Sequence, residues 1–315
     1  MEQNLNVSKP LFVHEQVRIN KFKTVLLIVS FAALILGICY LIGYVYDNVA
    51  MGFLIGAGYC AFIIPIQIIS SKSMLVSSVH GRAVNENSPN ERRVRRLVEG
   101  LSISAGLKEP PQVFIIPTDT PNAFAGGLTP EKSYIGVTEG LLAILEDSEL
   151  EGVIGHEMSH IIQRDVLIST IAIALMSITI FLAGIFYRTS AYGSRRRSRS
   201  DNNGGGNAAI LILLGLVVYL VARLLANLIN LAISRKREYA ADATAVRLCS
   251  NSEGLARALE KIAGVSGQYN ARTVSDLGGD EMLCLYIYNP KKKLMALFST
   301  HPPIEERIAR LRNMY

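Results

Sequence analysis

The chain has 315 residues, of which 50% are hydrophobic and only 18% are charged, and its formal net charge is +6. This composition is that of a membrane protein rather than of a soluble domain. The positive charge does not indicate a nucleic-acid partner, because we find no nucleic-acid-binding module and because basic residues are expected beside membrane spans whose loops stay in the cytoplasm.

The four cysteines predict neither a disulfide framework nor a thiolate metal site. Cys39 and Cys60 lie in apolar runs, and Cys249 and Cys284 lack the spacing of metal ligands. Reduced thiols fit a catalytic part that faces the cytosol.

Residues 1–23 form a basic tail, and two runs without charged residues follow at 24–46 and 49–70. Each run has the ~20 residues that a helix needs to cross ~30 Å of hydrocarbon. With only two residues between them, the runs predict a transmembrane hairpin. No cleavage site ends the first run, so we expect it to be retained. Gly52 and Gly56 predict close helix packing within the bundle, with dimerisation as the alternative.

Residues 71–165 are soluble in character and, with the basic tail, are expected to face the cytoplasm. A helix is predicted to begin at Pro89 with apolar residues at helical spacing, and to end near Gly106. Its outward face holds four arginines. They indicate a solvated surface, and the alternative is a site for anionic lipid headgroups. These arginines are Arg92, Arg93, Arg95 and Arg96.

Short β-like runs at 112–117, 122–128 and 133–137 predict a small sheet. If the second run forms an exposed edge, a substrate peptide could bind it as an added strand. The alternative is an ordinary hairpin with Phe124 in the core, and the sequence does not decide between them. The candidate substrate-binding residues are Asn122, Ala123, Phe124 and Ala125.

Residues 156–160 read His-Glu-Met-Ser-His and lie within the longer run 148–165. On a helix, His156 and His160 lie about one turn apart on nearly the same face, so both imidazoles can reach one metal ion. Glu157 would project beside the ion, where a general base can take a proton from a metal-activated water. A capping box of Ser148 and Glu151 is predicted to begin the helix. The plainer alternative is a helix with two ordinary histidines.

Two further apolar runs, at 166–187 and 208–234, predict membrane helices, with buried core helices as the alternative. The loop between them, 188–207, is rich in arginine and glycine and is expected to be flexible. If both runs cross the membrane, this loop lies outside, against the tendency of basic loops to stay inside. Since the third metal ligand is expected after these runs, both must cross or neither does.

Glu238 is the candidate third ligand, because zinc in hydrolytic sites is held by three protein groups, and two histidines with one glutamate are a known set. Asp242, one turn further, could accept a hydrogen bond from a ligand imidazole. Helices are predicted at 252–263 and 304–312. Near the last one, His301 could stabilise an oxyanion and Arg307 could orient a ligand carboxylate, although a histidine before two prolines is more often a loop residue.

Together these motifs resemble the HtpX family of heat-shock membrane proteases. That family is grouped with the CAAX prenyl endopeptidases among the gluzincin-like zinc metalloproteases, and the resemblance covers nearly the whole chain after the tail. It rests on the hairpin and on four motifs, at 122–125 (Asn-Ala-Phe-Ala), 156–160, 238–242 (Glu-Tyr-Ala-Ala-Asp) and 299–303 (Ser-Thr-His-Pro-Pro).

The resemblance implies a protease of the bacterial inner membrane, with its active site facing the cytosol, that acts in quality control of damaged membrane proteins. It implies one Zn²⁺ per chain, held by His156, His160 and Glu238, with Glu157 as the catalytic base. Residues 122–125 would line the substrate cleft. Asp242, His301 and Arg307 would be supporting residues, with His301 acting in catalysis.

We therefore expect a mainly α membrane protein of the α+β class, with an anchor of about four helices and a zincin-like domain with a small sheet. Its partners would be membrane-protein or unfolded polypeptide substrates and the lipid bilayer; the oligomeric state is not indicated. A transporter or channel, or a non-proteolytic zinc-containing adaptor, are the rival functions. The expected parts are a cytosolic tail (1–23), a transmembrane hairpin (24–70), a catalytic part (71–165), two hydrophobic helices with their loop (166–234) and a second catalytic part (235–315).

Overall fold

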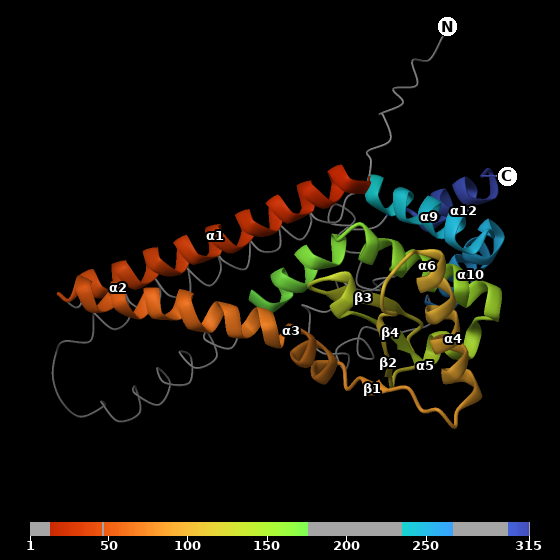
Figure 1. Cartoon of the computed structure of the whole chain (residues 1–315), viewed down its shortest axis with the longest axis horizontal. Coiled ribbons are helices and arrows are strands. Elements are labelled where there is room, and N and C mark those ends of the chain that lie inside the picture. The colour runs from red at the N-terminus through yellow and green to blue at the C-terminus, as the bar shows by residue number, and fades with distance from the viewer. Residues whose placement is uncertain (1–12, 46, 176–234, 267–301, 315) are drawn as a thin grey trace, which may run out of the picture.

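The computed structural model describes residues 13–45, 47–175, 235–266 and 302–314. A long helical hairpin projects from a body in which helices surround a small sheet (Figure 1). The hairpin consists of α1 (Val13–Val45) and of a second rod made from α2 (Val49–Gly58), a π-helical turn η1 (Tyr59–Ile63) and α3 (Ile64–Ser78). Within these rods, Val17–Leu41 and Val49–Ser78 are long and apolar enough to cross a membrane.

Glycines let the two rods of the hairpin approach closely. A Cβ at Gly52 would collide with the backbone oxygen of Cys39 in α1, and a Cβ at Gly56 would lie 2.9 Å from the Cys39 Cβ. At the tip, the Asn48 side chain accepts a hydrogen bond from the Met51 amide at 3.0 Å and caps α2. The two glycines therefore pack inside the hairpin, as expected, and this packing leaves them unsuited to dimerisation.

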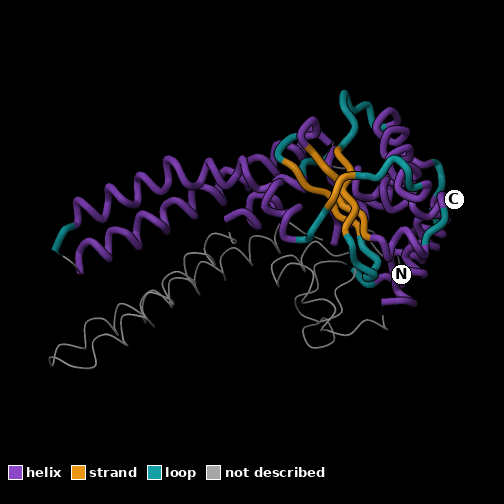
Figure 2. Tube along the Cα trace, turned by 90° about the horizontal axis from the view of Figure 1, so that it is seen from below, coloured by secondary structure: helices purple, strands orange, loops and turns teal. Residues whose placement is uncertain are grey.

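Four strands form one mixed sheet (Figure 2). Its order is β1-β2-β4-β3, with β2 and β4 parallel and the other pairs antiparallel. The three predicted β-runs are present as β2, β3 and β4, but β1 was not predicted, because two residues are too few to show a pattern. The bounds are β1 (Arg82–Ala83), β2 (Gln112–Ile116), β3 (Ala123–Gly127) and β4 (Ser133–Thr138).

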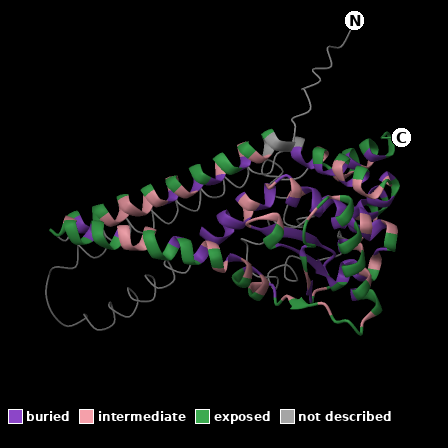
Figure 3. Cartoon of the chain, viewed as in Figure 1, coloured by how far each residue is buried: buried purple, intermediate pink, exposed green. Residues whose placement is uncertain are grey.

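The centre of the body is α6 (Asp147–Ile162), which is buried along most of its length (Figure 3). Ile135 and Val137 of β4 pack with α6 in the main core, whereas Tyr134 packs with the end of α3 on the other side of the sheet. Around α6 lie α4 (Pro89–Ser104), α5 (Glu139–Ile144), α9 (Arg235–Cys249), α10 (Ser252–Ser266) and α12 (Ile304–Arg312). The helices predicted at 89–106, 252–263 and 304–312 are thus confirmed.

The predicted cap of the metal helix was placed two residues too late. Glu146 is the N-cap residue and Glu149 completes the capping box, so Ser148 lies inside the first turn. The Glu149 carboxylate accepts from the Glu146 amide at 2.9 Å and also pairs with Lys261 of α10 at 2.7 Å. The capping box and the ion pair with Lys261 fix the start of the helix at Glu146, and the Ser148 hydroxyl instead accepts a hydrogen bond from Arg257 of α10 at 3.3 Å.

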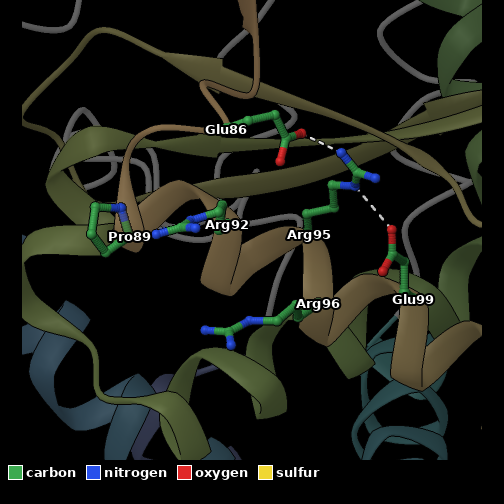
Figure 4. Close-up of a pocket in the computed structure, with 6 residues that line it drawn as sticks. All are labelled: Glu86, Pro89, Arg92, Arg95, Arg96 and Glu99. Carbon is green, nitrogen blue, oxygen red and sulfur yellow. Dashed lines mark hydrogen bonds and ion pairs between the residues drawn. The ribbon is translucent and has the colours of Figure 1, made fainter.

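The arginines on α4 form a mixed-charge surface. Arg93 turns inward and donates to the carbonyls of Leu142 and Leu145 at 3.3 and 3.0 Å. Arg95 pairs with Glu86 and Glu99 at a surface hollow that Arg92 and Arg96 also line (Figure 4). Because two carboxylates share the hollow and α4 lies on the side of the body away from the hairpin (Figure 1), the structure favours the solvated-face interpretation over lipid headgroup binding.

After α6 the chain turns sharply at Arg164, whose φ is +61°, and a new helix runs from Asp165, bent by 80° from α6. Its described part, Asp165–Leu175, packs against α1 and α3. The apolar contacts join Ile168 and Ile171 to Leu27, Phe31 and Ile64. The rest of the third apolar run, the fourth run and the loop between them lie outside the described residues, and their membrane disposition stays a prediction.

Candidate metal centre

Two imidazoles from α6 and one carboxylate from α9 converge inside the body. The Nε2 atoms of His156 and His160 are 3.3 Å apart, as expected for side chains one turn apart on the same helix face. Glu238, in the first turn of α9, places its Oε2 3.6 Å from the His156 Nε2 and its Oε1 3.7 Å from the His160 Nε2. The three side chains predicted as ligands thus lie together, although 77 residues separate His160 from Glu238 in the sequence.

The distances between the two Nε2 atoms and the Glu238 carboxylate oxygens fit a zinc ion. Tetrahedral zinc with bonds of ~2.0–2.2 Å places its ligand atoms about 3.3–3.6 Å apart. The set of two imidazoles and one carboxylate is one that zinc accepts, and all three atoms lie within 4.8 Å of one another. His156 and Glu238 are almost completely buried. Without a metal ion, the charge of the buried Glu238 carboxylate is compensated by the Arg307 Nη1 at 3.8 Å and by protonated histidines.

Asp242 and Arg307 contact the Nδ1 side of the His156 imidazole. The His156 Nδ1 donates to the Asp242 Oδ1 at 2.9 Å, which leaves Nε2 to face the other ligands. Arg307 grips the same carboxylate with two bonds, from Nη2 at 2.6 Å and from Nε at 2.9 Å. Arg307 is only 1% exposed. Its Nη1 also lies 3.8 Å from the Oε2 of Glu238, so Arg307 contacts both Asp242 and the candidate metal-binding carboxylate.

Asp165 holds His160 in the same manner, and the sequence reasoning missed it. The His160 Nδ1 lies 3.2 Å from the Asp165 Oδ2, and Arg237 donates to the other oxygen at 3.0 Å. Asn20 of α1 donates to that oxygen as well, at 2.7 Å. A clue was available, since an aspartate that directly precedes an apolar run close to a metal helix needs a buried partner. Nothing in the sequence identified Asn20 or Arg237.

Glu157 lies next to His156 on α6 and is 6% exposed. Its side chain projects ~100° around the helix from His156, beside the converging ligand atoms rather than among them. The Arg307 guanidinium also interacts electrostatically with this carboxylate. The arrangement gives an anionic group next to the metal position, where it could exchange protons with a bound water or substrate.

The electrostatics of the centre favour protons on the histidines when no metal is bound. Burial and the charge of Arg307 lower the pKa of His156, but the bonds to Asp242 and Glu238 outweigh them and raise it to about 9. The pKa of His160 is also raised, because Asp165 and Glu238 together outweigh its burial. Burial opposes ionisation of Asp242, yet Arg307 and His156 hold its pKa below the ordinary value. A metal ion must therefore displace protons to bind.

The candidate substrate-binding segment forms strand β3 beside α6. β3 is last in the sheet order and pairs only with β4 among the described strands. Its side chains are buried, and Phe124 belongs to a core cluster with Ile116 and Tyr134. Phe124 thus lies in the core, as in the hairpin alternative, because α6 and the end of α3 cover both faces, and binding of a substrate strand to the edge stays a prediction. Asn122, Ala123, Phe124 and Ala125 are 0%, 1%, 4% and 6% exposed.

His301, the other candidate catalytic residue, lies outside the described residues, and its role stays a prediction. The chain is described again from Pro302, which leads directly into α12 and its Arg307. The segment that contains His301 is thus tied at one end to a helix of the metal centre.

The chain matches a family described as Peptidase family M48 over residues 88–315. A protein named Protease HtpX homolog from Streptococcus gordonii is 39% identical over 303 residues, which cover 95% of this chain and 99% of that protein. A protein of the same name from Listeria monocytogenes is 42% identical over 311 residues, with 95% and 99% covered. The crystal structure of S. mikatae Ste24p overlaps with a TM-score of 0.47 at 17% identity, covering 95% of this chain and 67% of that one.

These matches define the class as a metallopeptidase associated with a membrane. The protein belongs to peptidase family M48 and, within it, to the HtpX-type proteases. The resemblance stated from the sequence motifs is thereby confirmed.

Proposed function

We propose that the protein is a zinc endopeptidase, with one Zn²⁺ per chain held by His156, His160 and Glu238. The observation that supports this most is that the two histidine Nε2 atoms lie 3.3 Å apart and each lies 3.6 or 3.7 Å from one oxygen of Glu238, although the histidines precede and Glu238 follows the long apolar region. Two histidines and one carboxylate leave a fourth position of a tetrahedral ion open. A purely structural zinc site is normally closed by four protein ligands.

In the proposed reaction, Glu157 accepts a proton from the attacking water and transfers it to the leaving amine of the scissile peptide. Zinc, when bound, supplies Lewis acidity that polarises the substrate carbonyl and lowers the pKa of a water. Asp242 and Asp165 keep the two ligand imidazoles in the tautomer that directs Nε2 toward the ion. His301 is proposed to donate a hydrogen bond to the oxyanion.

The proposed substrates are misfolded or damaged membrane proteins and unfolded polypeptides. The outer edge of β3 lies beside α6, and backbone atoms at residues 122–125 could pair with an extended substrate even though the side chains are buried. The described start of the third apolar run follows the metal helix directly, so the centre lies close to apolar helices. This closeness supports substrates that are themselves in the membrane.

We further propose a location in the bacterial inner membrane, with both catalytic parts (71–165 and 235–315) in the cytosol. The basic tail and the arginines of residues 71–165 support this orientation. If runs 166–187 and 208–234 both cross, the anchor has four helices. Cysteine labelling at the loop 188–207 in intact cells tests that number. The loop can be labelled from outside only if both runs cross the membrane.

The decisive test of the activity is Glu157→Gln. This change keeps the size of the side chain and removes the base, so we expect unchanged zinc content and a fall in cleavage rate of ~10²–10⁴-fold. Zinc is measured by metal analysis of the purified full-length protein, and cleavage with casein and a membrane protein, each with and without a chelator.

The matched control is Glu151→Gln, the same change on the same helix at a partly exposed position. It should leave both measurements near wild type. A Glu157→Gln variant that still cleaves at the normal rate would refute the proposed base. If the wild-type protein binds zinc but cleaves nothing, the adaptor interpretation is supported instead.

A further inference from the structure

The N-terminal part of α1 contains a buried amide where the surrounding residues are polar. Asn20 is 0% exposed, while its neighbour Lys21 is exposed. It precedes the first apolar run (24–46) and belongs to the helix that forms the membrane hairpin. A fully buried amide requires hydrogen-bond partners, and these partners lie more than 140 residues away in the sequence.

The Asn20 side chain donates two hydrogen bonds to the turn that follows the metal helix. Its Nδ2 donates to the Gln163 carbonyl at 3.0 Å and to the Asp165 Oδ1 at 2.7 Å. Arg164, between these two acceptors, has a φ of +61°. The Asn20 amide therefore bonds to the residues before and after Arg164 and holds this strained turn, which follows His160 closely in the chain.

Through Asp165, the Asn20 side chain is connected to His160, a candidate metal ligand. The second oxygen of Asp165 lies 3.2 Å from the His160 Nδ1, so fixing this carboxylate also fixes the plane and tautomer of the imidazole. Arg237 shares the Oδ1 atom at 3.0 Å. Asp165 thus accepts hydrogen bonds from α1, α9 and α6, which come from Asn20, Arg237 and His160.

We propose that Asn20 is a positioning residue for the metal centre: it holds Asp165 so that Asp165 can orient His160. The proposal rests on the proposed function of His160 as a metal ligand. Its consequence is that the first membrane helix is a component of the active site and not only an anchor. Metal retention then depends on how α1 is seated against the body.

The test uses Asn20→Ala in the full-length protein in detergent. Removing the donor frees Asp165 to move, and we expect the zinc affinity, measured by competition with a chelator, to fall about tenfold, at the lower end of the effect of an outer partner. The rise in unfolding temperature on adding zinc should shrink as well, because that rise depends on affinity for the folded state.

The matched control is Thr24→Val, one turn further along α1. Thr24 is also buried and donates to the Asn20 carbonyl at 2.8 Å, so the change disturbs the packing of α1 without touching Asp165. It should lower the unfolding temperature of the metal-free and zinc-bound protein equally. Zinc affinity should stay at the wild-type value.

A charge-swapped pair keeps the proposal testable if the alanine variant folds poorly. Asn20→Asp places two carboxylates together and should weaken zinc binding more than Asn20→Ala does. Combining it with Asp165→Asn restores a donor and an acceptor across the same contact and returns an oxygen to the His160 Nδ1. Because Asp165→Asn weakens zinc binding by itself, the double variant is compared with Asp165→Asn, and Asn20→Asp should cost much less zinc affinity in that background than in the wild-type protein.

Wild-type zinc affinity in Asn20→Ala, or an equal cost of Asn20→Asp in the wild-type and Asp165→Asn backgrounds, would overturn this proposal and leave the proposed function intact. Failure of the wild-type protein to bind zinc or to cleave peptides would instead overturn the function itself. An equal fall in unfolding temperature with and without zinc in Asn20→Ala, with affinity unchanged, would assign Asn20 to the packing of α1 alone.

Discussion

The two ligand histidines are supported by the same kind of partners in two different surroundings. His156 is backed by Asp242 and Arg307, whose side chains are 2% and 1% exposed and come from helices of the C-terminal part. His160 is backed by Asp165 and Arg237, each 9% exposed. The first set lies in the interior, and the second lies where the body meets the membrane hairpin.

The contrast shows how one metal site can be fixed on one side and dependent on the membrane anchor on the other. Arg307 holds Asp242 with two bonds in the rigid geometry of a guanidinium fork. Asp165 instead collects single bonds from Asn20 and Arg237. We expect changes on the His156 side to damage the fold, and changes on the His160 side to alter metal binding with less cost in stability.

The largest effect should follow Arg307→Ala. It leaves the buried Asp242 carboxylate without its cation, and breaking a buried pair in this way costs about 3–5 kcal/mol of unfolding free energy. Chemical denaturation of the metal-free protein measures it. Arg310→Ala is the control on the same helix, since its pair with Glu306 is exposed and contributes less than about 1 kcal/mol. Equal losses in the two variants would contradict the difference in burial.

The next effect compares Asp242→Asn with Asp165→Asn. Both changes keep an oxygen for the imidazole Nδ1 but remove the charge that makes the ligand more basic, so each should weaken zinc binding by about 10–100-fold. We expect the larger loss for Asp242, because it is more deeply buried and its contact to the imidazole is shorter, 2.9 against 3.2 Å. Chelator competition on both variants measures this, and equal losses of zinc affinity would show that the two sides are equivalent.

The smallest difference between the two sides is expected in the pH dependence of zinc binding. In the metal-free protein the pKa of His156 is raised from 6.5 to about 9, so its protonated form stabilises the fold; this contribution is complete below about pH 6.5 and is lost as the pH rises through about 9. Zinc must displace that proton, so apparent affinity should rise up to about tenfold per pH unit and level off above about pH 9.

Asp242→Asn removes a group that raises this pKa, and the levelling should then begin at lower pH. Asp165→Asn acts on His160 and should leave that point nearly unchanged. Zinc affinities measured across this pH range check both statements, and an affinity independent of pH would contradict them.

Much of the fold could be predicted because its signals are local. The apolar runs predicted the hairpin from length alone, and the spacing of residues 156–160 predicted two imidazoles on one helix face. The helices α10 and α12 followed from their apolar periodicity. Glu238 could be placed near the histidines only through its chemistry and the family resemblance.

The features that the sequence did not reveal depend on tertiary contacts. Asn20 looks like an ordinary polar residue beside a membrane span until the turn at Arg164 is seen against it. The helix start moved from Ser148 to Glu146 because Lys261, more than 100 residues away, pairs with Glu149. Such long-range pairing leaves no periodic trace along the chain.

The 80° bend after α6 has a practical consequence for handling the protein. The helix that leaves the bend presents Ile168, Ile171 and Leu175 to α1 and α3. Deleting the hairpin to obtain a water-soluble protease would uncover this apolar face, which also includes Ala172. The hairpin therefore cannot be removed without exposing apolar surface on the catalytic body. Preparations for assay need the full-length chain in detergent or lipid.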